Sequence, residues 1–242
     1  MQPWCTGPVE ILEHGLSLLS HDSDRNRRLA MIAIDNAVEL AVKTYLGLPK
    51  RVTGLSLSRK EYGEISESFP RLLDALEQYA LGKLDGIDLG EVEWYHRLRN
   101  QLYHQGNGLT VEKEKVQVYS ELARLLFRNL FDVEVEGARS KTHAMLGTFL
   151  SEWVELERTI ARLARQYRSD LTVTGGRLPA PMIAFQNLAA TGAIRKSTAR
   201  RIDFYRAIRN RLVHGEGDPG DLLSEEALTE LGNLRKEIDQ LV

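Results

Sequence analysis

The stretch LRNQLYHQG at 98–106 carries a pattern that returns 110 residues later as IRNRLVHGEG at 208–217. Each copy reads Arg-Asn, three further residues and His, and a glycine follows each His within two positions. On an α-helix the Asn and the His of one copy lie one turn apart on the same face. The glycine favours an end of the helix directly after the His. The two stretches therefore predict two equivalent helices, each with a polar edge at its C-terminal end.

The likeness of the two halves extends beyond this motif. A segment containing Val-Glu-Leu precedes each copy, and 60 residues separate Glu39 from Arg99 while 54 separate Glu155 from Arg209. The residues just before the motif, WYHRLRN and FYRAIRN, share an aromatic pair with a Tyr four residues before the Arg. These correspondences predict an internal duplication.

Apolar residues recur with helical spacing along nearly the whole chain, and no alternating run of strand length ends in hairpin turn residues. The sequence therefore predicts an all-α fold, with residues 50–68 irregular or weakly helical. Besides the helix that carries the first motif, we expect helices over 24–46, 69–81, 111–131, 143–168, 181–190, 198–214 and 225–241.

Two of the expected helices show clear amphipathic faces. The helix over 24–46 has Asp24 as its expected N-cap. Its spacing places the following residues on one face: Leu29, Ile32, Ala33, Asn36, Ala37, Leu40 and Lys43. In the helix over 111–131, the residues expected to face inward are Val116, Tyr119, Leu122, Leu126 and Leu130.

Residues 132–141, DVEVEGARSK, have too few large apolar side chains to form an element of their own. We place the domain boundary there. The expected domains are two tandem helical bundles over 8–133 and 140–242, each long enough for its own apolar core.

Composition excludes several classes of protein. Hydrophobic residues make up 43% and charged residues 27% of the chain, and no apolar run reaches the roughly 20 residues that span a bilayer. No secretion signal is expected at the start. Cys5 is the single cysteine, which excludes an internal disulfide framework and thiolate zinc sites and favours a reducing cytoplasm. With 32 basic and 34 acidic residues, net charge does not predict nucleic-acid binding.

Local charge is more informative between residues 195 and 211, where Asp203 is the only acidic residue. Such a segment can attract the phosphates of RNA, although a basic run taken alone more often forms a solvated helix face. Its basic residues are Arg195, Lys196, Arg200, Arg201, Arg206, Arg209 and Arg211. The predicted RNA-binding residues are Arg195, Lys196, Arg200, Arg201 and Arg206.

The repeated Arg, Asn and His suit acid–base chemistry on a phosphodiester. An imidazole titrates near neutral pH, and a guanidinium is a permanently charged, bidentate donor to phosphate oxygens. In RNA a base can activate the 2′-hydroxyl to attack the adjacent phosphorus, so this reaction needs neither a metal nor another cofactor. Arg would offset the charge that grows on the non-bridging oxygens, and Asn would orient the His or the phosphate.

At this point the sequence resembles the HEPN-domain family. RNQLYH and RNRLVH are similar to the family motif in which His follows Arg after four to six residues, and AIDNAVELAVKTYL resembles its first long helix. The resemblance implies two HEPN-like bundles related by a pseudo-twofold axis. It also implies a metal-independent RNA endonuclease of toxin–antitoxin, antiviral defence or RNA-processing systems, whose active site is pooled from two facing domains.

By this resemblance the catalytic residues would be Arg99, His104, Arg209 and His214, with Asn100 and Asn210 in support. Glu39 and Glu155 either orient a motif Arg or form buried salt bridges. Tyr95 and Tyr205 either stack on bases or, as the apolar stripe around them favours, lie in the core. Neither copy continues as His-x-Tyr, the form that an antitoxin modifies in some HEPN toxins, so regulation by that route is not expected.

Other readings stay open. A non-catalytic HEPN-like module could use the same basic groove to hold RNA, a nucleotide or a protein partner, and a homodimer is compatible with either reading. The sequence has no phosphate-binding loop and no His-Glu-x-x-His metal motif. Of the other histidines, His96 lies one turn before Asn100 and can border the site, and Arg206 takes the equivalent place in the second half.

Overall fold

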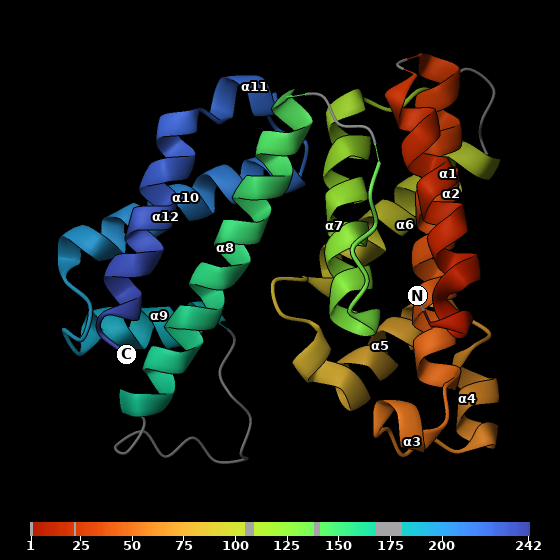
Figure 1. Cartoon of the computed structure of the whole chain (residues 1–242), viewed down its shortest axis with the longest axis horizontal. Helices are drawn as coiled ribbons and strands as arrows, with labels where there is room; N and C mark the ends of the chain where they lie inside the picture. The colour runs from red at the N-terminus through yellow and green to blue at the C-terminus, as the bar shows by residue number, and fades with distance from the viewer. Residues whose placement is uncertain (1, 22, 105–108, 138–140, 168–180) are drawn as a thin grey trace. The chain divides into compact units, whose positions relative to one another are not determined.

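The computed structural model describes residues 2–21, 23–104, 109–137, 141–167 and 181–242. Every regular element in these ranges is helical, which confirms the all-α prediction (Figure 1). The fold divides into two compact units, which are described separately. Unit 1 comprises Met1–Ser140 with Val213–Gly215, and unit 2 comprises Lys141–Leu212 with Glu216–Val242.

Unit 1 contains the first motif and the helices before and after it. These elements are η1 (Pro3–Cys5), α1 (Thr6–Ser20), α2 (Asp24–Gly47), α3 (Lys50–Thr53), α4 (Arg59–Ile65), α5 (Phe69–Ala80), η2 (Leu81–Lys83), α6 (Leu89–His104) and α7 (Lys113–Phe131). The sequence analysis did not predict α1, although Val9, Leu12, Leu16 and Leu19 recur at helical spacing and all are buried.

Helix α7 is the centre of unit 1. From Val116 to Phe131 every residue is buried except the half-buried Arg128. The five residues expected to face inward are among them, so that prediction is confirmed. A helix buried nearly all round must be covered by several neighbours, and α7 packs against α1, α2 and α6.

Helices α1 and α2 approach each other closely at Gly15. A Cβ atom at this position would lie 2.9 Å from Cγ1 of Ile34 and 3.2 Å from its backbone nitrogen. Because the first distance is shorter than real Cβ contacts and the second is unusually tight, a side chain at position 15 would force Ile34 to shift. This contact determines how closely α2 packs against α1.

The buried face of α2 differs from the face that the sequence indicated. Leu29 and Leu40 are exposed, and Asn36 is exposed as well. The face that packs into unit 1 consists of Ala30, Met31, Ile34, Asp35, Ala37, Val38, Ala41, Val42, Tyr45 and Leu46. Small alanines bring α2 close to its neighbours, and this packing outweighs the hydrophobicity of the larger leucines. The N-cap is Ser23 rather than Asp24, and its side chain accepts a hydrogen bond from the Asn26 N–H at 3.2 Å.

His214 falls in unit 1, with Val213 and Gly215, and the rest of the second motif, including Arg209 and Asn210, falls in unit 2. The elements of unit 2 are α8 (Lys141–Gln166), α9 (Pro181–Ala190), α10 (Lys196–Val213), α11 (Pro219–Leu222) and α12 (Glu225–Asp239), and α8 packs along α12 and against α9 (Figure 1). The buried face of α12 consists of Leu231, Leu234 and Ile238. The Ser224 hydroxyl caps this helix by accepting from the Ala227 N–H at 3.1 Å, as the sequence predicted.

No helix in the described ranges is both long and apolar enough to cross a bilayer. The predicted break at TVTGGRLPAP and the residues just after His104 lie largely outside the described residues. The pseudo-twofold relation between the halves stays a prediction.

Candidate functional site

The guanidinium of Arg99, the Arg of the first motif, is held by three polar groups. Its Nε donates to Asp35 Oδ2 at 2.6 Å, its Nη2 donates to Glu39 Oε2 at 3.1 Å, and its Nη1 donates to Asn100 Oδ1 at 2.8 Å. Asp35 and Glu39 lie one turn apart on α2, so the guanidinium of α6 lies across two successive turns of the neighbouring helix. The side chain of Arg99 is only 14% exposed. Its orientation is therefore fixed by bonds on several sides.

Asp35 is the hub of this network and has no solvent-exposed surface. Besides Arg99 it contacts His96 Nδ1 through Oδ2 at 3.0 Å, and its Oδ1 accepts a hydrogen bond from the Tyr119 hydroxyl at 2.7 Å. A buried carboxylate is costly unless charged or hydrogen-bonded partners surround it. Here α2, α6 and α7 each supply part of the site, so the network links three helices of unit 1.

Aromatic rings enclose the network. The ring of His96 stacks on Phe69 with centroids 4.1 Å apart, and the ring of Tyr119 stacks on Tyr95 with centroids 4.5 Å apart. Burial, together with the nearby Asp35 carboxylate, raises the pKa of Tyr119 well above its usual value. The phenol therefore stays protonated and keeps donating to Asp35.

The charges around Arg99 are balanced. Glu39 also accepts from Lys43 Nζ at 2.6 Å, so the two carboxylates Asp35 and Glu39 stand against the two fixed cations Arg99 and Lys43. Asp35, Glu39 and His96 offer ligand atoms within 4.8 Å of one another, which is the geometry of a possible cation site. Because Arg99 and Lys43 already neutralise both carboxylates, the cluster fits an ion-pair network better than a metal centre.

His104 is the last residue of α6 and is exposed. Its ring lies edge-on to the ring of Tyr103, with centroids 5.2 Å apart, and Tyr103 is 66% exposed. Residues 105–108 lie outside the described residues, so the helix end expected after the first motif stays a prediction. The first motif therefore offers a fixed Arg and an exposed His.

The second motif has different surroundings. Arg209 is half-buried, Asn210 is exposed, and His214 follows the last residue of α10 and is exposed. Glu155 pairs with Arg158 on its own helix at 2.5 Å, whereas its counterpart Glu39 pairs with Arg99. The position equivalent to Asp35, four residues before the Glu, is Ser151. The buried carboxylate of the first half thus has no acidic counterpart there.

Both motif-flanking tyrosines, Tyr95 and Tyr205, are buried, which confirms the core reading over the base-stacking one. Leu102, Ile208 and Leu212 are also buried and Leu98 is half-buried, as expected for the apolar side of the motif helices. In unit 2, burial and the adjacent Glu230 carboxylate raise the pKa of Tyr205 to about 12.

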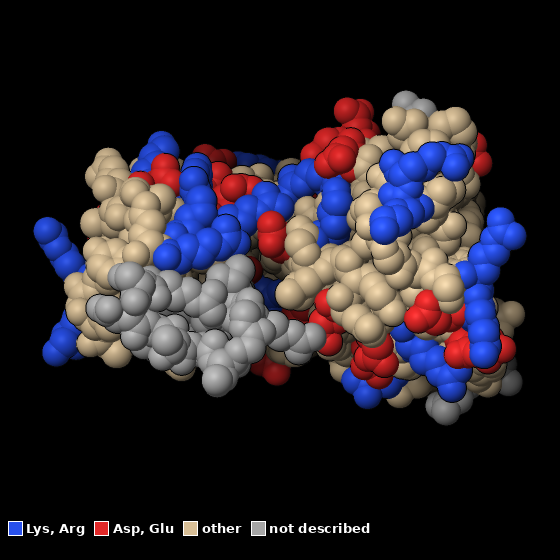
Figure 2. All heavy atoms as spheres, turned by 90° about the horizontal axis from the view of Figure 1, so that it is seen from below, with Lys and Arg blue, Asp and Glu red and all other residues tan. Residues whose placement is uncertain are grey.

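The basic residues of α10 and its start divide into two groups. Arg201 pairs with Glu237 at 2.7 Å, and Arg206 pairs with Asp203 at 3.0 Å. Arg195, Lys196 and Arg200 are exposed. In Figure 2, Lys and Arg side chains gather in a band in the left part of the view, where Figure 1 draws α8 to α12, with acidic side chains at its borders. Some of the predicted RNA-binding residues therefore stabilise unit 2, and others face solvent.

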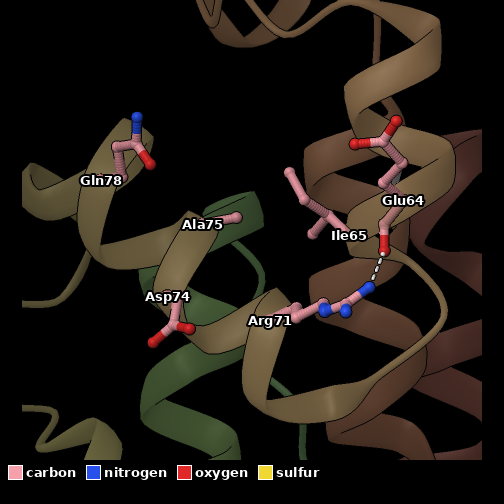
Figure 3. Close-up of a pocket in the computed structure, with 6 residues that line it drawn as sticks. All are labelled: Glu64, Ile65, Arg71, Asp74, Ala75 and Gln78. Carbon is pink, nitrogen blue, oxygen red and sulfur yellow. Dashed lines mark hydrogen bonds between the residues drawn. The ribbon is translucent and has the colours of Figure 1, made fainter.

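A surface pocket of about 430 Å³ lies elsewhere in unit 1, between α4 and α5 (Figure 3). In it Arg71 donates to the backbone oxygen of Glu64 at 3.2 Å. The pocket is lined by Glu64, Ile65, Arg71, Asp74, Ala75 and Gln78. None of the residues predicted for the site contributes to it, so the pocket is separate from the motif.

Sequence reasoning missed Asp35, which organises the site. The signal was present, because Asp35 lies one turn before Glu39 and among Ile34, Ala37 and Val38, which are all buried. His96 was expected to border the site, and it does so through Asp35. Tyr119 was expected only as a core residue, although its hydroxyl is part of the network.

The chain was compared with protein-family models, with curated proteins and with solved structures, and none of them matches it. The resemblance to HEPN domains therefore depends on the motifs and helices of this chain alone.

Proposed function

We propose that this protein is a metal-independent RNA endonuclease, with a composite active site to which both motifs contribute Arg and His. The observation that carries the proposal is the fixed guanidinium of Arg99 on the same helix as the exposed His104. The three bonds to Asp35, Glu39 and Asn100 use three of the five guanidinium N–H groups. One N–H on each terminal nitrogen lies outside these bonds and can be donated to a phosphate oxygen.

A guanidinium fixed in advance is suited to catalysis, because it does not have to reorganise while charge develops on the phosphate. In the proposed reaction one His takes the proton of the RNA 2′-hydroxyl, whose oxygen attacks the adjacent phosphorus. The other His protonates the departing 5′-oxygen. The products are a 2′,3′-cyclic phosphate and a 5′-hydroxyl, so protons and bonds balance without a metal. Toxin–antitoxin, antiviral and RNA-processing roles in the cytoplasm suit such an activity, with an antitoxin or another regulatory protein as its partner.

One observation favours the alternative, a non-catalytic module that binds RNA, a nucleotide or a protein. The carboxylates of Asp35 and Glu39 offset the charge of Arg99, and this reduces the attraction that Arg99 can exert on a phosphate. In this reading the network stabilises the bundle, and the exposed basic residues of unit 2 provide the binding surface.

Incubating the protein with total RNA in EDTA tests the proposal. The wild type should cleave, and His104→Ala and His214→Ala should each lose on the order of 100-fold or more of the rate if both act in acid–base steps. The double variant should fall little below the worse single one. His14→Ala, which replaces an exposed histidine on α1, is the matched control and should cleave like the wild type.

Three results would count against the mechanism. Cleavage that EDTA abolishes and Mg²⁺ restores would refute metal independence. Cleavage that survives in the double variant would remove the motifs from catalysis and favour the alternative. If a mixture of the two single variants regains substantial activity, sites form between chains, and the site would not be built by one chain.

A further inference from the structure

Phe204 on α10 is an unusual surface residue. It is 60% exposed, whereas the neighbouring Tyr205 is 2% exposed. The two rings meet nearly at right angles, with an interplanar angle of 76° and centroids 5.3 Å apart. The buried Tyr205 thus supports one side of an aromatic ring that otherwise faces solvent. Such a ring can stack on another flat group.

Arginines lie on either side of Phe204 along the same helix. Arg200 precedes it by four residues, one helical turn, and Arg211 follows it by seven, two turns, so all three lie on one face. The residue between Phe204 and Arg211 on that face is Ala207, which is small and exposed. We call Arg200, Phe204, Ala207 and Arg211 the α10 stripe. His214, the second motif His, follows Arg211 by three residues.

The arginines of the α10 stripe differ from the other basic residues of the helix. In the part of the chain that the structure describes, neither Arg200 nor Arg211 forms an ion pair, although Arg201 and Arg206 both do. An unpaired, exposed guanidinium keeps its full attraction for an anion. The α10 stripe therefore combines an open aromatic ring with two uncompensated charges, spaced along about three helical turns.

This combination fits an unpaired stretch of nucleic acid. Base–aromatic stacking and arginine–phosphate contacts are the two interactions by which proteins hold single strands. A base within a duplex is already stacked on its neighbours, and the narrow major groove of an RNA duplex does not admit a helix. A second copy of this chain is a poorer occupant, because a twofold contact would place the same arginines against one another. One large apolar side chain is also too little for a stable protein interface.

We propose that the α10 stripe binds single-stranded RNA, with an unpaired base stacked on Phe204 and phosphates held by Arg200 and Arg211, and thereby selects unpaired segments for cleavage near His214. This inference rests on the proposed function in taking RNA as the substrate. The stripe, and not the network around Arg99, then discriminates between single-stranded and duplex RNA.

The test is fluorescence anisotropy with a labelled, unstructured 2′-O-methyl RNA of about 12 nucleotides, a length within the range of known single-strand sites. The probe has no free 2′-hydroxyl, so the proposed reaction cannot consume it. Phe204→Ala should weaken binding about 10-fold or more, as loss of one stacked base predicts. Phe204→Trp, which keeps an aromatic ring, should bind like the wild type, and Phe204→Leu should bind like Phe204→Ala.

The arginines are tested by the salt dependence of binding. Arg200→Gln and Arg211→Gln should each reduce the slope of log affinity against log salt by about 0.7, the value for one phosphate contact in a single strand. Arg201→Gln is the matched control, since Arg201 already pairs with Glu237, and it should leave the slope unchanged. With a duplex of the same sequence, Phe204→Ala should have no effect on affinity.

Each contrary result has a distinct meaning. Wild-type affinity in Phe204→Ala, or an equal loss for duplex and single strand, overturns the proposal, and it does so even if total RNA is cleaved. Binding that depends on Phe204 without any cleavage of total RNA supports the α10 stripe and refutes the nuclease instead. If light scattering shows a dimer that Phe204→Ala dissociates, the stripe is a contact between copies, and the proposal is overturned.

Discussion

Replacing Asp35 by Asn should destabilise unit 1 strongly. The substitution keeps the shape of the side chain but removes a charge that is completely buried and that contacts Arg99, His96 and Tyr119 at 2.6, 3.0 and 2.7 Å. The new amide also turns a donor toward groups that are themselves donors. Removing one partner of a buried ion pair costs about 3–5 kcal/mol, because the other charge stays buried without compensation.

The expected fall in unfolding free energy is therefore about 3–5 kcal/mol. Glu39 remains as the second carboxylate partner of Arg99, at 3.1 Å, so we expect a value nearer the lower limit. For a unit of this size the midpoint temperature should fall by roughly 10 °C. Urea unfolding followed by far-UV circular dichroism measures the free energy directly.

Asp74→Asn is the control, because it makes the same chemical change at an exposed position on α5 of the same unit. It should leave the unfolding free energy within about 0.5 kcal/mol of the wild type. If Asp35→Asn also costs less than about 1 kcal/mol, the network does not stabilise the bundle, and the account of Arg99 as a fixed side chain is wrong.

Two further predictions concern Tyr119, which donates to Asp35 in unit 1, and Glu237, which pairs with Arg201 in unit 2. Tyr119→Phe removes the hydroxyl that donates to Asp35 but keeps the stacked ring. Urea unfolding should therefore show an unfolding free energy lower by about 1.5–3 kcal/mol. An unchanged unfolding free energy would contradict the hydrogen bond. The hydrogen bond from Thr198 and the ion pair with Arg201 lower the pKa of Glu237 from its usual 4.5. The ionised carboxylate therefore stabilises the fold above pH 4.5, and this contribution is lost as the pH falls through the lowered pKa. Glu237→Gln should therefore melt below the wild type at about pH 6, with a gap that narrows toward about pH 3, and a gap independent of pH would show that the carboxylate has no such role.

The all-α fold and most of its long helices could be predicted because the apolar spacing and the capping residues act within one helix. The hydroxyl of Ser224 and the inward stripe of α7 are examples, and both are found as expected. The buried face of α2 was not predictable in the same way. Which face of α2 is buried depends on small residues that pack against α1 and α7, and the sequence of α2 alone does not contain those neighbours.

The site was predictable in part for the same reason. The repeated motif identified Arg99, and an orienting contact between Glu39 and the motif Arg was one of two interpretations of Glu39. Asp35, in contrast, contributes through contacts with residues that lie 61, 64 and 84 positions away in the sequence. A polar residue among inward-facing ones is a local signal of such a hub. Which residues it meets depends on the tertiary packing of three helices.

Gly15, at the crossing of α1 and α2, lies far from the motif in sequence, yet it affects the position of Asp35. Gly15 touches Ile34, and Ile34 directly precedes Asp35, the residue that holds Arg99. A side chain at position 15 would force Ile34 to shift, and any shift of the α2 backbone at Ile34 would also move the adjacent Asp35 carboxylate, on which the motif Arg depends. Helix α1 is thus a structural support of the motif, so an excised fragment or a graft of the motif helix onto another bundle would need α1 and its glycine to keep Arg99 in place.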